Sequence, residues 1–366
     1  AVVAHLDLCL GCRGCESACP AGVRYGRLIE QTRAYLEGRA RRPIGQRLKR
    51  WVVGQLFPYP RRLALLLWPA RLAEVMGVRP WLERHLPGAL GEWLSLIPRR
   101  QAIVATCASV SADGPAVAIH AGCVTRVVAP ATTDNATELL ARAGYRADPA
   151  LFTACCGALD LHSGNRPRAL EFARANVRRF VQAGGADHII STASGCTTAM
   201  AEYGELLKDD PDLARPASEF ARRVSELSTL LLKATRPLEG SCEATVTYHD
   251  ACHLAHGMGV RREPRQLLKA VGGVKLVELE SSDLCCGSAG SYNLTQPQAA
   301  AALGRRKADT IEQSGAQYVV MANPGCQFQI AAELRRRGSS IQVMHLADFL
   351  AQAVARREQL ARENAR

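Results

Sequence analysis

One arrangement of cysteines occurs twice in this chain. It consists of a single cysteine, a Cys-Cys pair and a last single cysteine: Cys123, Cys155, Cys156 and Cys196 in the first copy, and Cys252, Cys285, Cys286 and Cys326 in the second. Corresponding cysteines lie 129, 130, 130 and 130 residues apart, and 39 residues separate the pair from the last cysteine in both copies. Four offsets that agree this closely indicate an internal duplication. We therefore expect two similar units, each of which brings four cysteines together.

The number and spacing of the cysteines favour metal ligation over disulfide formation. The chain holds 14 cysteines, but it is much longer than the small secreted proteins that depend on disulfides. Adjacent cysteines seldom bond to each other, because a disulfide needs Cα atoms about 4.4–6.8 Å apart and a suitable torsion. Clustered cysteines in a chain of this kind are more typical of a metal site. Buried structural cysteines are the alternative for a Cys-Cys pair.

Length and composition set the class of protein. With 366 residues, the chain has room for two or three domains of about 100–200 residues. Its 48% of apolar residues can form a buried core, which excludes a disordered chain. A transmembrane helix needs about 20 continuous apolar residues, whereas the longest apolar run covers residues 63–70 and contains Pro69. The sequence therefore predicts a folded chain without a membrane-spanning helix.

Both copies of the cysteine pattern alternate strand-like and helix-like runs. Short apolar runs lead into the first and last cysteine of each copy, at residues 117–120, 188–191, 246–249 and 318–321. Helical patterns follow at residues 166–182, 197–207, 296–313 and 328–337. This alternation predicts an α/β fold with a largely parallel sheet. Ligands bind beyond the carboxyl ends of such strands, which is where the cysteines would lie.

The chain divides into four predicted parts. Residues 1–23 are dense in cysteine, and residues 24–100 form a basic arm with helical patterns and several prolines, which predict short helices. Residues 101–238 and 239–366 hold the two copies of the cysteine pattern, and we call them the first repeat and the second repeat. Cys107 and Cys242 are out of register with the duplication, so we expect neither to be a ligand.

The N-terminal cysteines have the spacing of a bacterial ferredoxin. Cys9, Cys12, Cys15 and Cys19, followed by Pro20, form the run C-x2-C-x2-C-x3-C-P. Their thiolates are soft ligands suited to iron, and a zinc knuckle is the alternative. In two-cluster ferredoxins the fourth cysteine of such a run ligates the other cluster. We therefore expect Cys19 to serve a second cluster whose other ligands come from an upstream run, absent from this numbering, or else to close a single cluster.

The basic arm carries most of the positive charge. Residues 24–100 hold 16 Lys and Arg against 5 Asp and Glu, nearly the whole excess of +12, and all four tryptophans. Trp favours the bilayer interface and basic side chains are attracted to anionic lipid. We expect peripheral membrane contact or docking to a partner subunit, with a helical arm packed across the repeats as the alternative. The aromatic residues are not interleaved as in nucleic-acid readers, so nucleic acid is not expected.

Histidines near the second copy are weak candidates for a catalytic role. His249 and His253 flank Cys252, and His120 is the counterpart of His249. Histidine can handle protons beside a redox site, but ordinary histidines at a strand end are the alternative. Asp250 has no acidic counterpart in the first copy, so an acid–base site is expected in the second.

The duplicated motif and the N-terminal run together resemble the cysteine-rich (CCG) domain family. Its members include the iron–sulfur subunits of glycolate oxidase and of lactate and anaerobic glycerol-3-phosphate dehydrogenases, and the cysteine-rich component of heterodisulfide reductase. Residues 9–24, 284–290 and 323–326 look most like the glycolate oxidase subunit. The resemblance implies that each copy contributes its four cysteines to up to one [4Fe-4S] cluster, with one or two clusters at the N-terminal run. Ala193 and Asn323 stand where heterodisulfide reductase has a fifth cysteine, a departure that disfavours its five-thiolate clusters.

The resemblance implies an electron-transfer function. The chain shows no G-x-G-x-x-G and no Walker loop, so we expect no flavin, NAD or nucleotide on it. A separate flavin-binding subunit would oxidise a 2-hydroxy acid such as glycolate, and electrons would pass through this chain to a membrane quinone. The expected location is the cytoplasm, at the inner face of the cell membrane. The alternatives are a catalytic subunit that reduces a disulfide or quinone at a CCG cluster, and a zinc scaffold.

Overall fold

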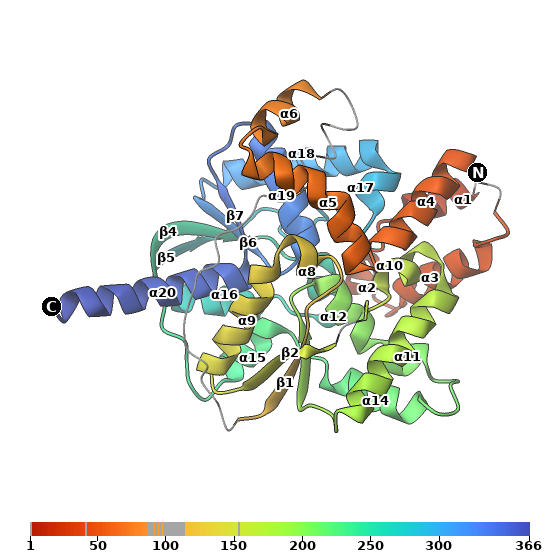
Figure 1. The fold of residues 1–366 in the computed structure, drawn as a ribbon, viewed down its shortest axis with the longest axis horizontal. Helices are drawn as coiled ribbons and strands as arrows, with labels where there is room; N and C mark the ends of the chain where they lie inside the picture. The colour runs from red at the N-terminus through yellow and green to blue at the C-terminus, as the bar shows by residue number, and fades with distance from the viewer. Residues whose placement is uncertain are drawn as a thin grey trace.

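Two parallel sheets organise the repeats in the computed structural model, which describes residues 2–40, 42–86, 91, 94, 97, 114–152 and 154–366 (Figure 1). The first sheet has the order β2-β1-β3, with strands β1 (Ala116–His120), β2 (Arg146–Phe152) and β3 (His188–Ser191). The second has the order β5-β4-β6-β7, with strands β4 (Ser241–Tyr248), β5 (Gly272–Val277), β6 (Tyr318–Met321) and β7 (Gln342–His345). All described pairings are parallel. The predicted α/β class and the duplication are therefore confirmed.

The second sheet contains one strand more than the first. Strand β7 pairs with β6 through Val319 and Val343, whereas at the corresponding edge the described residues of the first repeat form an isolated bridge between Ile189 and Val224. The sequence did not predict β2, β5 or β7. All three are edge strands, where pairing on one side only allows residues of low strand propensity such as Pro149 in β2.

Helices connect the strands in both repeats. The first repeat contains α8 (Thr125–Val128), α9 (Pro130–Arg142), α10 (Ala158–Ser163), α11 (Arg166–Gln182), α12 (Ser194–Ala201), α13 (Tyr203–Leu206), α14 (Ala214–Arg223) and α15 (Leu227–Lys233). The second contains the π-helix η1 (His253–Met258) and helices α16 (Arg262–Ala270), α17 (Tyr292–Thr295), α18 (Pro297–Gln313), α19 (Pro324–Arg336) and α20 (Leu346–Asn364). The helical pattern at 166–182 matches α11 in full, whereas 197–207 falls across α12 and α13, which are separate helices.

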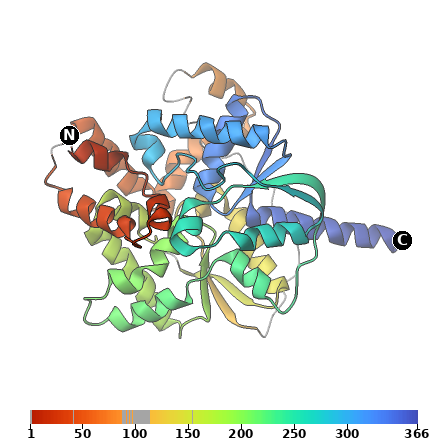
Figure 2. The ribbon, with the colours of Figure 1, turned by 180° about the vertical axis from the view of Figure 1, so that it is seen from behind.

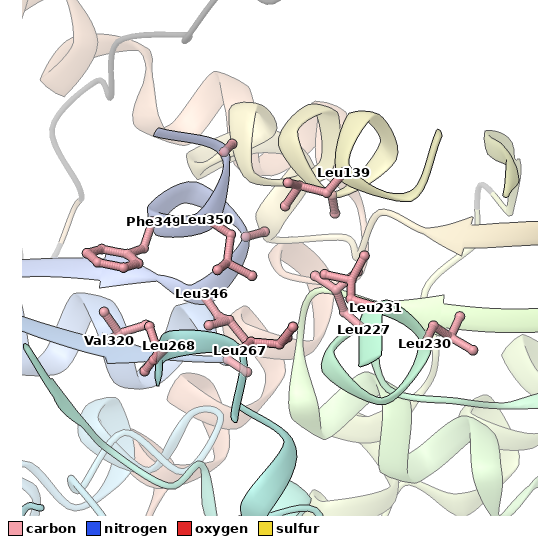
Figure 3. Close-up of a cluster of buried hydrophobic side chains, with 14 of the residues drawn as sticks. Leu139, Leu227, Leu230, Leu231, Leu267, Leu268, Val320, Leu346, Phe349 and Leu350 are labelled. Atoms are coloured by element: carbon pink, nitrogen blue, oxygen red, sulfur yellow. The ribbon is translucent and has the colours of Figure 1, made fainter. Parts of the chain in front are cut away.

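The two repeats share one hydrophobic core. Helix α15 of the first repeat packs against α16 of the second, and α20 of the second packs against α9 of the first. Figure 3 shows the leucines that meet there, with Leu139 from α9, Leu227 and Leu231 from α15, and Leu346 and Leu350 from α20. Burying each such side chain stabilises the fold by about 1.5–3 kcal/mol. Each repeat thus contributes a helix that packs against a helix of the other, and these contacts fix the position of one sheet relative to the other. The C-terminal end of α20 projects from the body of the molecule (Figures 1 and 2).

The N-terminal part and the basic arm are helical. Their helices are α1 (Val2–Leu8), α2 (Gly14–Ala18), α3 (Tyr25–Leu36), α4 (Ile44–Leu56), α5 (Pro60–Val75) and α6 (Arg79–His85). Pro43 precedes α4 and Pro60 opens α5, as expected for helix starts. The prediction that every proline divides the arm was wrong at Pro69, which lies inside α5. Its neighbour one turn earlier, Leu65, is exposed, so water can satisfy the carbonyl that Pro69 leaves without a donor. None of the helices in the described ranges is long and apolar enough to cross a bilayer.

Candidate metal centres

The strands deliver each cysteine set to the carboxyl end of its sheet. In the first repeat, Cys123 follows β1, the Cys155–Cys156 pair follows β2, and Cys196 lies in the first turn of α12 after β3. The second repeat places Cys252 after β4, the Cys285–Cys286 pair after β5, and Cys326 in the first turn of α19 after β6. We call these the first and second cysteine sets. Both occupy the position where parallel α/β sheets hold their ligands.

The sulfur atoms of each set converge. In the first set, the Sγ atoms of Cys155 and Cys123 lie 3.5 Å apart, and those of Cys156 and Cys196 lie 3.1 Å apart. In the second set, the Sγ atoms of Cys286 and Cys326 and a ring nitrogen of His249 all lie within 4.8 Å of one another. All described cysteines are free thiols. Four soft donors that converge without a disulfide fit iron or zinc.

Hydrogen bonds between thiols favour the ionised form of two members in each set, Cys155 and Cys196 in the first and Cys285 and Cys326 in the second. A hydrogen bond from Cys286, with a further contribution from His249, lowers the pKa of Cys326 to about 5 against the effect of burial. Cys156 and His120 act in the same way on Cys196 and lower its pKa to about 6. The thiolate is the form of cysteine that binds metals. The same hydrogen bonds raise the pKa of the partner thiols, so each set combines thiolates with protonated thiols that a metal would have to displace protons from.

The glycine after each Cys-Cys pair is required by the backbone. Gly157 and Gly287 have φ angles of +79° and +89°, a region that disfavours other residues. Each donates its backbone N–H to the sulfur of the first cysteine of its pair, at 3.4 Å in both cases. A Cβ on Gly287 would lie 2.5 Å from the carbonyl oxygen of Ala300. The C-C-G motif thus combines a turn, an N–H donor to sulfur and a close helix contact.

Both cysteine sets open on one cavity. Its volume is about 270 Å³, and its lining includes all eight cysteines of the two sets. The side of the basic arm that faces the repeats contributes Phe57, Leu63, Leu66 and Leu67 to the lining. The cavity therefore lies between the two repeats, and α5 forms part of its wall.

The N-terminal cysteines lie against the second repeat. Burial raises the pKa of the Cys12 thiol, and the neighbouring thiols of Cys285, Cys9 and Cys15 act in the same direction. Cys19 has different surroundings, because backbone N–H groups of residues 21–23 lower the pKa of its thiol. The pKa of Cys12 thus responds to Cys9, to Cys15 and to Cys285 of the second cysteine set, whereas the pKa of Cys19 responds to the backbone turn that follows it.

Three contacts that the sequence did not reveal fix the N-terminal motif on the repeats. Arg13, whose φ is +61°, forms a two-pronged ion pair with Glu202 of the first repeat, with both N–O distances at 2.7 Å. Arg33 donates to the carbonyl oxygens of Leu6, Cys9 and His162. The Tyr292 hydroxyl of the second repeat donates to the carbonyl oxygen of Leu8. These pairings depend on tertiary packing, so spacing along the sequence gives no signal of them.

The histidines differ in their partners. His249 is buried, and neither of its ring nitrogens has a hydrogen-bond partner among the described residues. His253 lies 5.2 Å from His162 by ring centroids, and burial lowers the pKa of His253 well below its usual value. Asp250 is held by Arg265 and Ser282 rather than facing the cavity. Cys242 lies at the start of β4, away from the carboxyl edge, and Cys107 lies outside the described residues.

Comparisons with known proteins agree with this architecture. A sequence model of the cysteine-rich (CCG) domain matches residues 117–201 and 246–331. The chain is 33% identical to a probable glycolate oxidase iron–sulfur subunit of Bacillus subtilis (strain 168), over 95% of this chain and 82% of the relative. It is 32% identical to the glycolate oxidase iron–sulfur subunit of Escherichia coli (strain K12), over 96% of this chain and 82% of the relative. A lactate utilization protein A of Oceanobacillus iheyensis is 27% identical over 64% of this chain and 96% of the relative. The chain therefore belongs to the family of glycolate oxidase iron–sulfur subunits and carries two cysteine-rich (CCG) domains.

Proposed function

We propose that the chain is the electron-transfer subunit of a flavin-dependent 2-hydroxy-acid dehydrogenase, with glycolate as the representative substrate. A separate flavin-binding subunit oxidises the hydroxy acid, and this chain passes the electrons to a quinone. The proposal is supported by the relationship to glycolate oxidase iron–sulfur subunits and by two groups of cysteines that line one cavity. Clusters held by four cysteine thiolates are suited to electron transfer, with potentials set by their surroundings.

The proposal assigns a ligand role to twelve cysteines. The N-terminal ligands are Cys9, Cys12, Cys15 and Cys19, and the ligands in the repeats are Cys123, Cys155, Cys156 and Cys196 in the first and Cys252, Cys285, Cys286 and Cys326 in the second. Four thiolates per set are sufficient for one [4Fe-4S] cluster in each repeat. The cavity shared by the two sets is the observation that carries the proposal, because the cysteines of both sets line one largely apolar space.

Anaerobic reduction tests the electron-transfer role. The chain is purified together with its flavin-binding partner, glycolate is added, and the absorbance of the clusters is followed before and after addition of a short-chain quinone. We expect bleaching on addition of glycolate and recovery on addition of the quinone. Absence of bleaching with an active flavin-binding partner contradicts the proposal. Turnover of a disulfide by the purified chain alone would instead support the catalytic alternative.

The basic arm presents an apolar surface that we propose as the contact with the membrane. Along α5, Leu65, Trp68, Leu72 and Val75 are exposed at the spacing of one helix face, and Leu65 and Val75 are 76% and 73% exposed. Along α4, Ile44, Leu48 and Trp51 form a second exposed stripe. Exposed apolar side chains that gather on one helix face are typical of a surface that contacts a membrane or a partner. We call the two stripes the α4–α5 face; Figure 1 shows the two helices on the same side of the molecule.

Charge favours a bilayer as the occupant of the α4–α5 face. Arg47, Lys49, Arg61 and Arg62 are exposed on the same two helices, and a basic residue near an anionic membrane contributes about 1 kcal/mol. The opposite face of α5 lines the cavity through Leu63 and Leu67. A lipid-soluble quinone in the bilayer would therefore lie one helix away from the cysteine sets, at the inner face of the cell membrane.

Vesicle sedimentation tests this contact. We expect the chain to bind vesicles that contain anionic lipid and to dissociate at high salt, because exposed charges are screened. The double variant Trp51→Ser/Trp68→Ser should reduce binding at least tenfold. Val181→Ser removes an exposed apolar side chain from α11 in the first repeat and serves as the matched control. Unchanged binding by the tryptophan variant contradicts the proposal, as does binding of this face to the flavin-binding partner alone.

A further inference from the structure

A histidine occupies the same position in both repeats, but its ring nitrogens have different hydrogen-bond partners in each. The sequence reads His120-Ala121-Gly122-Cys123 in the first repeat and His249-Asp250-Ala251-Cys252 in the second. Both histidines are buried at the carboxyl end of the central strand of their repeat and lie beside the last cysteine of their set. The difference between them arises two residues later in the chain.

His120 is committed to the backbone through both ring nitrogens. Gly122 has a φ of +70°, and its N–H donates to Nδ1 of His120 at 3.2 Å. Because Nδ1 accepts this hydrogen bond, the ring proton is on Nε2, which lies 3.0 Å from the carbonyl oxygen of Ala154 and donates to it. In the neutral ring the one N–H of His120 is therefore directed at this backbone carbonyl, while the ring as a whole still lowers the pKa of the neighbouring Cys196 thiol.

His249 has no such backbone partners. Ala251 replaces the glycine and is not among the described residues with a positive φ. Both nitrogens of His249 are buried without a hydrogen bond among the described residues, and one lies within 4.8 Å of the sulfurs of Cys286 and Cys326. A buried donor without a partner costs about 1–3 kcal/mol, so an unpaired imidazole indicates that a partner is to be supplied.

Asn323 adds a second difference at the same sulfur. Its Nδ2 donates to Sγ of Cys326 at 3.3 Å. The corresponding residue before Cys196 is Ala193, which has no side-chain donor. The last cysteine of the second set therefore accepts a hydrogen bond from a side-chain amide that the last cysteine of the first set lacks.

We propose that His249 and Asn323 donate hydrogen bonds to the Cys326 sulfur and give the second metal centre a more positive reduction potential than the first. N–H donors to a ligating sulfur stabilise the additional negative charge of a reduced cluster. The inference rests on the proposed function, since it requires a cluster in each repeat. Cys285 acts on the pKa of Cys12, so the N-terminal motif adjoins the second set, and we expect it to exchange electrons with the second centre.

Reciprocal substitutions at Asn323 and Ala193 test the proposal. Asn323→Ala gives the second centre the surroundings of the first, and Ala193→Asn gives the first centre the donor of the second. Redox titrations of the purified chain, followed by EPR, report the midpoint potential of each centre. We expect Asn323→Ala to lower the midpoint potential of the second centre. A tenfold change in the equilibrium constant for reduction corresponds to about 59 mV for one electron. Ala193→Asn should raise the other midpoint, which brings the two potentials together in each variant.

Variants of His249 separate hydrogen bonding from packing. His249→Leu removes the donor and should lower the same midpoint as Asn323→Ala, whereas His249→Gln retains an N–H and should recover part of the shift. Iron and acid-labile sulfide are measured in every sample. Wild-type chain without iron and sulfide overturns the proposed function. Intact clusters with equal wild-type potentials, or with midpoints that neither Asn323→Ala nor Ala193→Asn moves, overturn this inference alone.

Discussion

The two repeats have the same strand order and the same four cysteines, but they surround the last cysteine differently. In the first repeat His120 is fixed by backbone hydrogen bonds and Ala193 offers no donor. In the second, His249 is unpaired among the described residues and Asn323 contacts the sulfur of Cys326. The duplication thus keeps the thiols and the turn that positions them, and varies the groups that adjust their chemistry.

The loop between β4 and Cys252 in the second repeat has side-chain hydrogen bonds that the corresponding loop of the first repeat lacks. Asp250 accepts two hydrogen bonds from Arg265, at 2.9 and 2.8 Å, and one from the Ser282 hydroxyl at 2.6 Å. Although burial raises the pKa of Asp250, these hydrogen bonds hold it below its usual value. Ala121 takes the place of Asp250 in the first repeat and has no side-chain group that could make such contacts.

The largest effect is expected from removing one thiol of each set. Cys156→Ser and Cys286→Ser should each abolish the cluster of their own repeat and leave the other repeat loaded, because the sets are separate. Iron and sulfide should fall by the share of one cluster in either variant. Cys242→Ser is the matched control, since this cysteine lies at the start of β4 and should not change the metal content. Loss of all iron in both variants would show that the sets are not independent.

Alanine in place of the C-C-G glycines should affect both repeats, and the second more strongly. A left-handed residue other than glycine costs about 1–3 kcal/mol, and a Cβ on Gly287 additionally lies 2.5 Å from the Ala300 carbonyl oxygen. At Gly157 the closest atom, the Ala169 carbonyl oxygen, is 3.1 Å away. Urea unfolding followed by circular dichroism should rank Gly287→Ala below Gly157→Ala in stability. The reverse order would contradict the geometry of these two turns.

Neutralising Asp250 tests the ion pair that only the second repeat contains at this position. Breaking a buried pair is costly because it leaves the partner charge uncompensated, and we expect Asp250→Asn to lower the free energy of unfolding by about 3 kcal/mol. Ala121→Asn places the same side chain in the first repeat and should change stability much less. Thermal unfolding at pH 7 measures both. Equal destabilisation by the two variants would show that the Asp250–Arg265 ion pair does not stabilise the second repeat.

The smallest effect is expected at the contact between the N-terminal motif and the first repeat. Glu202→Gln weakens the two-pronged ion pair with Arg13, and charged hydrogen bonds of this kind contribute about 1.5–3 kcal/mol. We expect faster proteolysis within residues 1–23 while the repeats remain intact. Glu205→Gln is the control, because the ion pairs of Glu205 with Arg27 and Lys208 are exposed. Similar proteolysis of both variants would show that Arg13 and Glu202 do not fix the motif.

Spacing along the sequence was sufficient to predict the central features of the fold. The offset of 130 residues predicted the duplication, and the apolar runs at 188–191 and 318–321 correspond to β3 and β6. The cysteines of the two sets could be assigned to the carboxyl ends of strands because parallel sheets place their loops there.

Features that depend on contacts between distant segments could not be predicted in this way. The packing of α15 against α16 and of α20 against α9 could be predicted only if it were known which apolar helix faces meet. The pairing of Arg13 with Glu202 joins residues 189 positions apart, and neither has a distinctive neighbourhood in the sequence. The different roles of His120 and His249 follow from backbone angles at the second residue after each. Sequence periodicity predicts helices and strands, whereas contacts between residues far apart in the sequence depend on tertiary packing.

Metal and sulfide analysis of the wild-type chain, combined with EPR of the reduced protein, tests the central claim most directly. Two loaded repeats predict at least about eight iron atoms per chain, with an equal amount of acid-labile sulfide and EPR signals typical of [4Fe-4S] clusters. The variants Cys156→Ser and Cys286→Ser would then assign the signals to the repeats. Zinc without acid-labile sulfide in the wild-type chain would contradict the account and would identify the cysteine sets as structural metal sites.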